Sequence, residues 1–251
     1  MIRLYAVSIA SAVVAAAVTL PSAAASIATF VAIDGRVIAE QLDGDTLTTQ
    51  VGRSPATHGS GIPGSREIQL SGIRQIIVLV GANMEITAGP APQRATLAID
   101  NNLSDAIAFS TEGDTLTISA ARSFVAKRPR IRVNVQTLQR LESRATDEIR
   151  VTGIAADSFA LKLGGTGTTS VSGKTAALSI ENSGSAFVDC SKVGASSVAL
   201  TSRGSGSTYL PRSANSSVRI DGSGSVFIPG DVSGVSRAGN GSGNVIAVPA
   251  P

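Results

Sequence analysis

The residue types that most often carry catalysis or bind transition metals are scarce in this sequence. Its 251 residues include one histidine and one cysteine. The histidine, His58, lies in a stretch rich in glycine and proline, and the chain has no Gly-X-Ser-X-Gly motif. A serine nucleophile needs a neighbouring base to activate it. We therefore predict no catalytic residue, and we interpret His58 as a solvated loop residue.

The acidic residues are scattered, which argues against a metal or catalytic site. Enzymes that cleave polysaccharides use paired acids for acid–base work, or clustered acids that hold calcium. The acids at turns or at repeat positions are Asp43, Asp45, Glu112, Asp114, Asp189, Asp221 and Asp231. A calcium site at Asp43-Gly44-Asp45 is the alternative to a bare turn there. We predict no metal and no cofactor.

One group of residues that could bind a ligand is basic. It consists of Lys127, Arg128, Arg130 and Arg132. Because Arg130 and Arg132 alternate with the apolar Ile131 and Val133, they fit one face of a strand. Such a face could contact lipopolysaccharide or an acidic glycan. The formal net charge of the whole chain is only +3, so we expect no nucleic acid as a partner.

A second candidate group is aromatic and follows a repeat in the last third of the chain. A Gly-centred unit recurs five times: Gly167-TTSV, Gly184-SAFV, Gly206-STYL, Gly224-SVFI and Gly243-NVIA. A flexible Gly/Ser linker would not keep the apolar residues in phase with the glycines. Coils of about 19 residues with short strands and tight turns suit a β-solenoid, and we predict an all-β, single-stranded β-solenoid.

The two-residue period of a strand assigns a face to each position of this unit. Positions two and four after the glycine are small, β-branched or Leu, and we expect them to point inward. Position three then points outward and forms a ladder of Phe187, Tyr209, Phe227 and Ile246. Exposed apolar rows usually mark a contact surface. Two alternatives stay open: another segment or chain covers the ladder, or the faces are reversed and the rings are core.

The first half of the chain also reads as β structure. Residues 38–48 and 107–117 share the pattern I-A-x-x-x-[DE]-G-D-T-L-T, which predicts a tight turn in each copy. Further predicted strands are 67–70, 76–80, 84–88, 96–100, 115–119 and 130–135. Residues 52–65 lack a period and read as a loop. Residues 137–144 read as one helical turn or as a polar corner.

Residues 1–25 have the pattern of a cleaved signal peptide. A single charge at Arg3 precedes an apolar run from Leu4 to Leu20, and Ala23-Ala24-Ala25 offers a cleavage site. The alternative is an N-terminal membrane anchor. In an exported chain the lone Cys190 cannot form an internal disulfide, and we predict a buried strand residue.

Residues 66–249 resemble the family called putative auto-transporter adhesin, head GIN domain. The resemblance is carried by REIQLSGIRQIIVLVGANMEITAG (66–89), EGDTLTI (112–118), RIRVNVQTLQRLES (130–143) and the Gly-Ser-Gly coils. It implies a right-handed parallel β-helix in exported proteins of Gram-negative bacteria, and it supplies no catalytic residue. The outward aromatic residues depart from the family, whose coils usually carry a polar residue there.

These observations predict a signal peptide (1–25), an N-terminal β segment and loop (26–65) and a β-helix domain (66–251). The predicted function is non-catalytic binding, adhesin-like, at the periplasm, the outer surface or the exterior of a Gram-negative cell. The predicted partner is a glycan or another envelope component. The first alternative is a structural envelope protein that assembles, and the second is a β-helical polysaccharide lyase or hydrolase.

Overall fold

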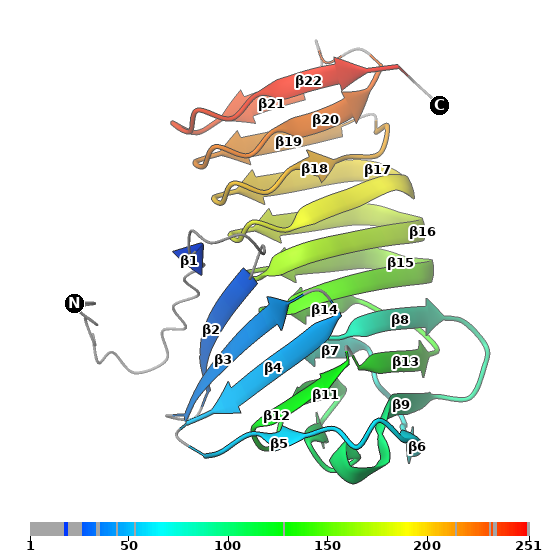
Figure 1. The fold of residues 1–251 in the computed structure, drawn as a ribbon. Helices are drawn as coiled ribbons and strands as arrows, with labels where there is room; N and C mark the ends of the chain where they lie inside the picture. Colours follow the sequence, from blue (N-terminus) through cyan, green and yellow to red (C-terminus); the bar gives the residue numbers. More distant parts are fainter. Residues whose placement is uncertain are drawn as a thin grey trace.

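The computed structural model describes residues 18–19, 27–33, 36–43, 45–52, 54–127, 129–213, 215–230, 232 and 235–249. The fold is all-β, with about 66% strand, and its strands form two sheets (Figure 1). A single 3-10 turn spans Asn101–Leu103 within the described residues. None of the helical structure described has the length and apolar character needed to cross a membrane. Of the predicted signal peptide, all but the strand Val18–Thr19 lies outside the described residues.

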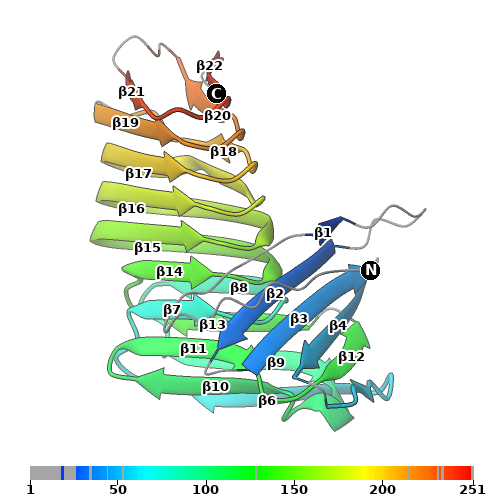
Figure 2. The same cartoon turned by 90° about the vertical axis from the view of Figure 1, so that its left-hand side faces the viewer.

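The larger sheet contains two runs of strands that stack rung upon rung (Figures 1 and 2). The first run, in spatial order, is β6 (Pro63–Gln69), β9 (Arg94–Asp100), β13 (Arg130–Val135), β8 (Asn83–Ala88), β15 (Thr146–Leu163), β16 (Thr166–Asn182), β17 (Phe187–Ser202), β18 (Thr208–Tyr209), β20 (Val226–Pro229) and β22 (Val245–Val248). The second run is β10 (Ile107–Glu112), β11 (Thr115–Ala120), β7 (Gln75–Val78), β14 (Arg140–Ser143), the later halves of β15, β16 and β17, then β19 (Asn215–Ile220) and β21 (Val235–Ala238). The long strands β15, β16 and β17 therefore belong to both runs.

Strand pairing in the upper part of this stack is parallel and follows the glycine repeat. Val188 pairs with Thr208, Thr208 with Val226, and Val226 with Val245, so each rung advances the chain by 18 to 20 residues. The predicted repeat of about 19 residues is thus the step from one rung to the next. At the other end the pairs β6–β9, β9–β13 and β10–β11 are antiparallel.

The core lies between the two runs and follows the predicted faces. Thr169, Val188, Thr208 and Val226 are in register on successive rungs, and each is at most 1% exposed. The last rung departs from this rule, because Val245 is half-buried and Ala247 is exposed. No further rung covers them among the described residues.

Glycine permits the close approach of successive rungs at the turn before β18. A Cβ on Gly206 would lie 2.0 Å from the carbonyl oxygen of Ala186, one rung below. A Cβ on Gly224 would likewise lie 2.1 Å from the carbonyl oxygen of Gly206. Any side chain at these positions would push the rungs apart, which explains why glycine recurs at each step.

The smaller sheet contains β1 (Val18–Thr19), β2 (Ile27–Ile33), β3 (Arg36–Asp43), β4 (Thr46–Val51), β12 (Phe124–Lys127) and β5 (Thr57–His58). Strand β12 is antiparallel to β4 and parallel to β5, so a later part of the chain completes the N-terminal sheet. Both predicted turns are confirmed as two-residue hairpin connections, since Asp43 pairs with Thr46 and Glu112 with Thr115.

The structure corrects two predictions about local structure. Residues 52–65 are not simply a loop, because β5 and the start of β6 lie within them. Pairing with β12 and β9 supplies the backbone hydrogen bonds of these strands, so no hydrophobic period is needed. Residues 137–144 contain strand β14, with Leu141 fully buried, and not a helical turn or a polar corner. The six other predicted strands all appear, with ends shifted by up to four residues.

Candidate ligand-binding face

The aromatic side chains of the repeat point outward, as predicted. Phe187 is 40% exposed, and Tyr209 and Phe227 are half-buried. Their strand neighbours Thr208 and Val226 are completely buried. The alternative in which the faces are reversed and the rings form the core is therefore wrong.

The register of the rungs corrects the predicted ladder at Phe187. Tyr209 pairs with Asp189, whereas Phe187 pairs with Thr168 in the next outward position along the strand. Phe187 is thus a diagonal neighbour of Tyr209, with ring centroids 5.5 Å apart and planes tilted by 51°. The chain between Gly184 and Gly206 is longer than the other repeats. Counting positions from the glycines therefore aligns Phe187 with Tyr209, although the strands pair Tyr209 with Asp189, two residues further along.

The ring geometry limits how this group can contact a ligand. The rings of Tyr209 and Phe227 are stacked, with centroids 4.4 Å apart and planes 15° apart. Phe227 in turn pairs in register with Ile246 on the last rung. Ring faces that lie against neighbouring side chains are not available to a sugar ring, so these rings present mainly their edges and the Tyr209 hydroxyl. Each such aromatic pair also stabilises the stack by about 0.5–1.5 kcal/mol.

The same outward row continues through the lower rungs to the basic strand. We call it the outer row. Its members are in register from β13 to β22: Arg132, Glu85, Arg150, Ser170, Asp189, Tyr209, Phe227 and Ile246. The seven steps between these eight rungs, at about 4.8 Å each, give the row a length of about 34 Å. The two candidate groups of the sequence, one basic and one aromatic, therefore lie at opposite ends of one face.

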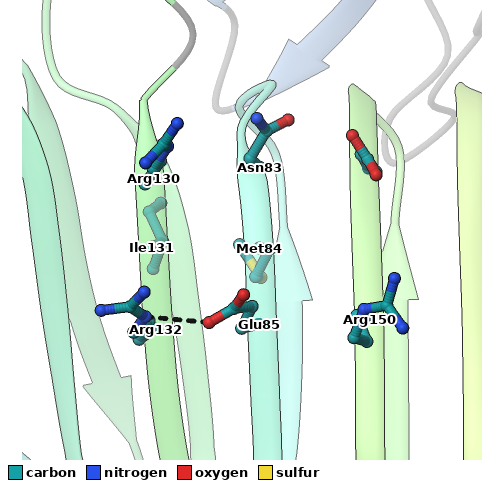
Figure 3. A pocket seen from close by; sticks show the side chains of 8 residues that line it. Asn83, Met84, Glu85, Arg130, Ile131, Arg132 and Arg150 are labelled. Carbon is teal, nitrogen blue, oxygen red and sulfur yellow. Dashed lines mark hydrogen bonds and ion pairs between the residues drawn. The ribbon is translucent and has the colours of Figure 1, made fainter.

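The basic end of the outer row contains a shallow hollow of about 260 Å³ across β13, β8 and β15 (Figure 3). Its floor includes Met84 and Ile131, which are buried. Its charged lining consists of Glu85, Arg130, Arg132, Glu148 and Arg150. Arg132 donates a hydrogen bond from Nε to Glu85 Oε2 at 2.8 Å. The exposed Arg150 makes no ion pair with any side chain that the structure describes.

The structure separates the members of the predicted basic run. Arg130 and Arg132 lie on β13 and line the hollow, as an alternating strand would place them. Lys127 is exposed at the end of β12, where it pairs with Thr46 in the other sheet. It does not belong to the outer row. Arg128 lies outside the described residues.

Sequence reasoning missed three residues of this face: Glu85, Glu148 and Arg150. They lie in the alternating segments NMEI of β8 and EIRV of β15, which have the same period as RIRV of β13. This alternation could have predicted that the charged residues of both segments point outward. It could not show that β13 lies beside β8, because 47 residues separate Arg132 from Glu85 in the chain.

The outward side of the second run carries ion pairs whose partners lie on the run itself. Glu142 is buried and bonds to Arg140 at 2.7 Å and to Arg144 Nε at 2.6 Å. Burial raises the pKa of the Glu142 carboxyl, but the hydrogen bonds and charges of the two arginines outweigh it and hold that pKa below its usual value. Lys162 lies 3.7 Å from Glu181 on the next rung. This side is largely neutralised by its own side chains.

The remaining candidates for chemistry are isolated from one another. Cys190 is completely buried in β17, as predicted, and burial raises the pKa of its thiol. His58 is exposed in β5. Among the residues that the structure describes, no three His, Cys, Asp or Glu side chains gather where they could hold a metal ion.

Comparison with known proteins places this fold in a family. The family model for "putative auto-transporter adhesin, head GIN domain" matches residues 73–232, more than half of the chain. A search of the curated proteins gives no match. Among solved structures, a putative adhesin from Bacteroides fragilis superposes with a TM-score of 0.61 at 15% identity, covering 77% of this chain and 100% of that one. This likeness shows a shared fold.

Two further solved structures are less similar. A putative lipid binding protein from Parabacteroides distasonis gives a TM-score of 0.48 at 20% identity, covering 77% of this chain and 100% of that one. A putative adhesin from Parabacteroides merdae gives 0.46 at 14% identity, covering 78% and 100%. The extent of the family match decides the assignment: this chain belongs to the putative auto-transporter adhesin, head GIN domain family.

Proposed function

We propose that this chain is an exported, non-catalytic binding module of the bacterial cell surface, and that its outer row holds a glycan. The observation that carries the proposal is the register of the outer row. It places outward arginines, carboxylates, hydroxyls and aromatic rings on one face about 34 Å long. A binding module needs such a face, and the arginine side chains and the Tyr209 hydroxyl can donate hydrogen bonds to the oxygens of a glycan.

The proposed architecture behind this face is a right-handed parallel β-helix. This architecture is supported by in-register parallel pairing in which each rung lies 18 to 20 residues after the one before it. Such a stack holds each side chain of the outer row at a fixed distance from the next, because the backbone hydrogen bonds set the rung spacing. A ligand with a regular repeat would meet a preorganised surface and order little of the protein on binding.

The absence of catalysis is part of the proposal. In the described part of the chain, Glu85 and Glu148 are the acids that line the hollow, and both lie among arginines. A glycosidase flanks the scissile bond with two carboxyl groups that have different tasks, whereas three of the five charged residues that line this hollow are arginines. Export is the other part, and the signal-peptide pattern of residues 1–25 supports it.

The test is binding of the purified chain to an array of bacterial and plant polysaccharides. The variant Tyr209→Ser/Phe227→Ser changes the outer row, and Thr201→Ala/Arg219→Ala changes outward residues of the second run. Intact circular dichroism and urea midpoints must accompany both. We expect the native chain to bind a subset of the glycans, the first variant to lose about tenfold or more in affinity, and the second to match the native chain. Failure of the native chain to bind any glycan would refute the proposed function.

A further inference from the structure

We infer that the hollow at the basic end of the outer row is a carboxylate-binding subsite, and that the ligand is an acidic polysaccharide lying along the outer row, across the strands. This inference rests on the proposed function and specifies the chemical class of the glycan. It is carried by three features of the face: the arginines of the hollow, the orientation of the aromatic rings and the spacing of the rungs.

The first feature is the arrangement of the arginines. Arg132 and Arg150 are in register on either side of Glu85, and Arg130 lies on the same face one outward position away from Arg132 (Figure 3). A guanidinium group is planar and always charged, and it binds a carboxylate through two parallel hydrogen bonds. Arg150 has no ion-pair partner among the described side chains, so its donors are open to a ligand.

Glu85 positions one of the arginines of the hollow. Its carboxylate accepts from Arg132 Nε and keeps that guanidinium at the edge of the hollow. Arg132 and Glu85 are both well exposed, so water screens their attraction and a ligand carboxylate competes with Glu85 at modest cost. Three arginines against two glutamates leave the hollow with an excess of positive charge.

The second feature is the exposure of ring edges at the other end of the outer row. The stacked Tyr209 and Phe227 turn their faces toward each other. The edge of an aromatic ring carries the positive part of its quadrupole. An edge therefore attracts carboxylate and hydroxyl oxygens, whereas a neutral sugar that stacks would need a free ring face. Both ends of the row thus favour a ligand rich in oxygen and negative charge.

The third feature is the match between the rung spacing and the repeat of a polysaccharide. A pyranose unit in a 1→4-linked chain is about as long as the rung spacing of about 4.8 Å. A chain along the outer row would therefore meet about one rung per sugar. Between the charged and aromatic ends the outer row contains Ser170 and Asp189. Ser170 is small and leaves room for the chain, and Asp189 Oδ1 accepts hydrogen bonds from the Ser191 N–H at 3.0 Å and hydroxyl at 2.6 Å.

The experiment compares two forms of one polymer. Polygalacturonate carries a carboxylate on every sugar, and its fully methyl-esterified form has the same backbone without the charge. We expect the native full chain to bind polygalacturonate at about 0.1 M NaCl and the ester about tenfold or more weakly. Raising NaCl to about 1 M shortens the screening length from about 10 Å to about 3 Å, and binding should weaken accordingly.

Variants separate this inference from the proposed function. Arg132→Gln/Arg150→Gln removes two charges from the hollow, and Lys162→Gln/Arg219→Gln removes two from the second run as the matched control. We expect the first variant to lose about tenfold or more for polygalacturonate and the control to lose less than about twofold. The carboxylate subsite would be overturned if the native chain bound polygalacturonate and its methyl ester equally and the two charge variants bound as the native chain does. Glycan binding by the outer row would still hold if Tyr209→Ser/Phe227→Ser bound more weakly in the same experiment. Binding to no polysaccharide would overturn both.

Oligogalacturonides of increasing length test the lengthwise placement. A ligand that spans the outer row should gain affinity up to about seven or eight sugars, because the row is about 34 Å long, and then reach a plateau. A plateau at two or three sugars would place the ligand across the hollow alone and would contradict a ligand that runs along the row.

Discussion

The stacked glycines give the sharpest test of the rung geometry, and Gly206→Ala is the variant to make first. A Cβ at this position would lie 2.0 Å from the carbonyl oxygen of Ala186 and 2.8 Å from its carbonyl carbon and its nitrogen. All three atoms belong to the backbone of the rung below, so no side-chain rotation can relieve the clash. Reaching the closest ordinary contact of about 3 Å requires the two rungs to separate locally by about 1 Å.

The cost follows from what that separation breaks. Overpacking of this kind costs about 1–3 kcal/mol. Loss of a backbone hydrogen bond such as the one from Gly206 N–H to the Gly184 carbonyl adds about 1 kcal/mol. We therefore expect Gly206→Ala to lower the free energy of unfolding by about 2–4 kcal/mol. With a denaturant dependence of about 2 kcal/mol per molar urea, the midpoint should fall by about 1–2 M.

Two other glycines provide matched controls for the urea experiment. Gly194→Ala places its Cβ 3.4 Å from the flexible Lys174 side chain, and we expect no loss and a gain of up to about 0.5 kcal/mol. Gly72 has a φ of 69° and open space around it, so Gly72→Ala should cost about 1–2 kcal/mol through backbone strain alone. A midpoint for Gly206→Ala equal to that of Gly194→Ala would refute the close approach of the rungs.

Two further predictions concern buried groups. The pKa of Glu142 is held below its usual value in the folded chain, so its ion pairs stabilise the fold above the unfolded pKa of about 4.3, and this contribution is lost as the pH falls through the lower, folded value. Glu142→Gln should therefore lower the free energy of unfolding at pH 7 by about 1–3 kcal/mol, and this free energy should decline less from pH 6 to pH 3 than that of the native chain. Urea unfolding measures both effects, with a substitution of the exposed Glu67, Glu67→Gln, as the control. Parallel pH profiles for the native chain and Glu142→Gln would contradict the prediction. Burial raises the pKa of the Cys190 thiol and shields it from reagents. Ellman's reagent should therefore titrate no thiol in the folded chain at pH 8 and one equivalent in denaturant. Rapid labelling of the folded chain would contradict the burial of Cys190.

The parts of the fold that could be predicted from sequence depend on short-range patterns. Alternation in the repeat places Thr208 inside and Tyr209 outside because a strand has a two-residue period. The hairpin at Gly113 follows from its acidic-Gly pair, and the structure gives that glycine a φ of 58°. In both cases the signal lies within a few residues of the feature that it predicts.

The parts that could not be predicted depend on pairing between distant segments. Strand β5 has no hydrophobic pattern, and its place is set by β12 more than sixty residues later. Glu142 is buried against the usual tendency of its residue type, since Arg140 and Arg144 neutralise it. The outer row joins the basic and aromatic candidates only because β13 lies between β9 and β8, an order that the chain does not follow.

The last rung bears on the choice between a binding module and an assembling envelope protein. Strands β21 and β22 have no strand beyond them among the described residues, and an open edge of this kind can recruit another chain. The inward row of the second run, however, passes from Leu161 through Leu200 and Val218 to Arg237. Arg237 is exposed and donates a hydrogen bond to the Gly243 carbonyl at 2.9 Å.

A charge at an inward position of an edge rung opposes the addition of another strand, because the incoming apolar row would bury it. The β21 half of the open edge is thus protected against end-to-end stacking, whereas Val245 and Ala247 on β22 leave apolar inward positions uncovered. The outer row has no comparable obstruction, since Ile246 at its upper end and Arg132 at its lower end are both exposed. Stacking of a further rung is therefore opposed at β21, and the exposed outer row on the side of the stack supports the proposed ligand binding over assembly.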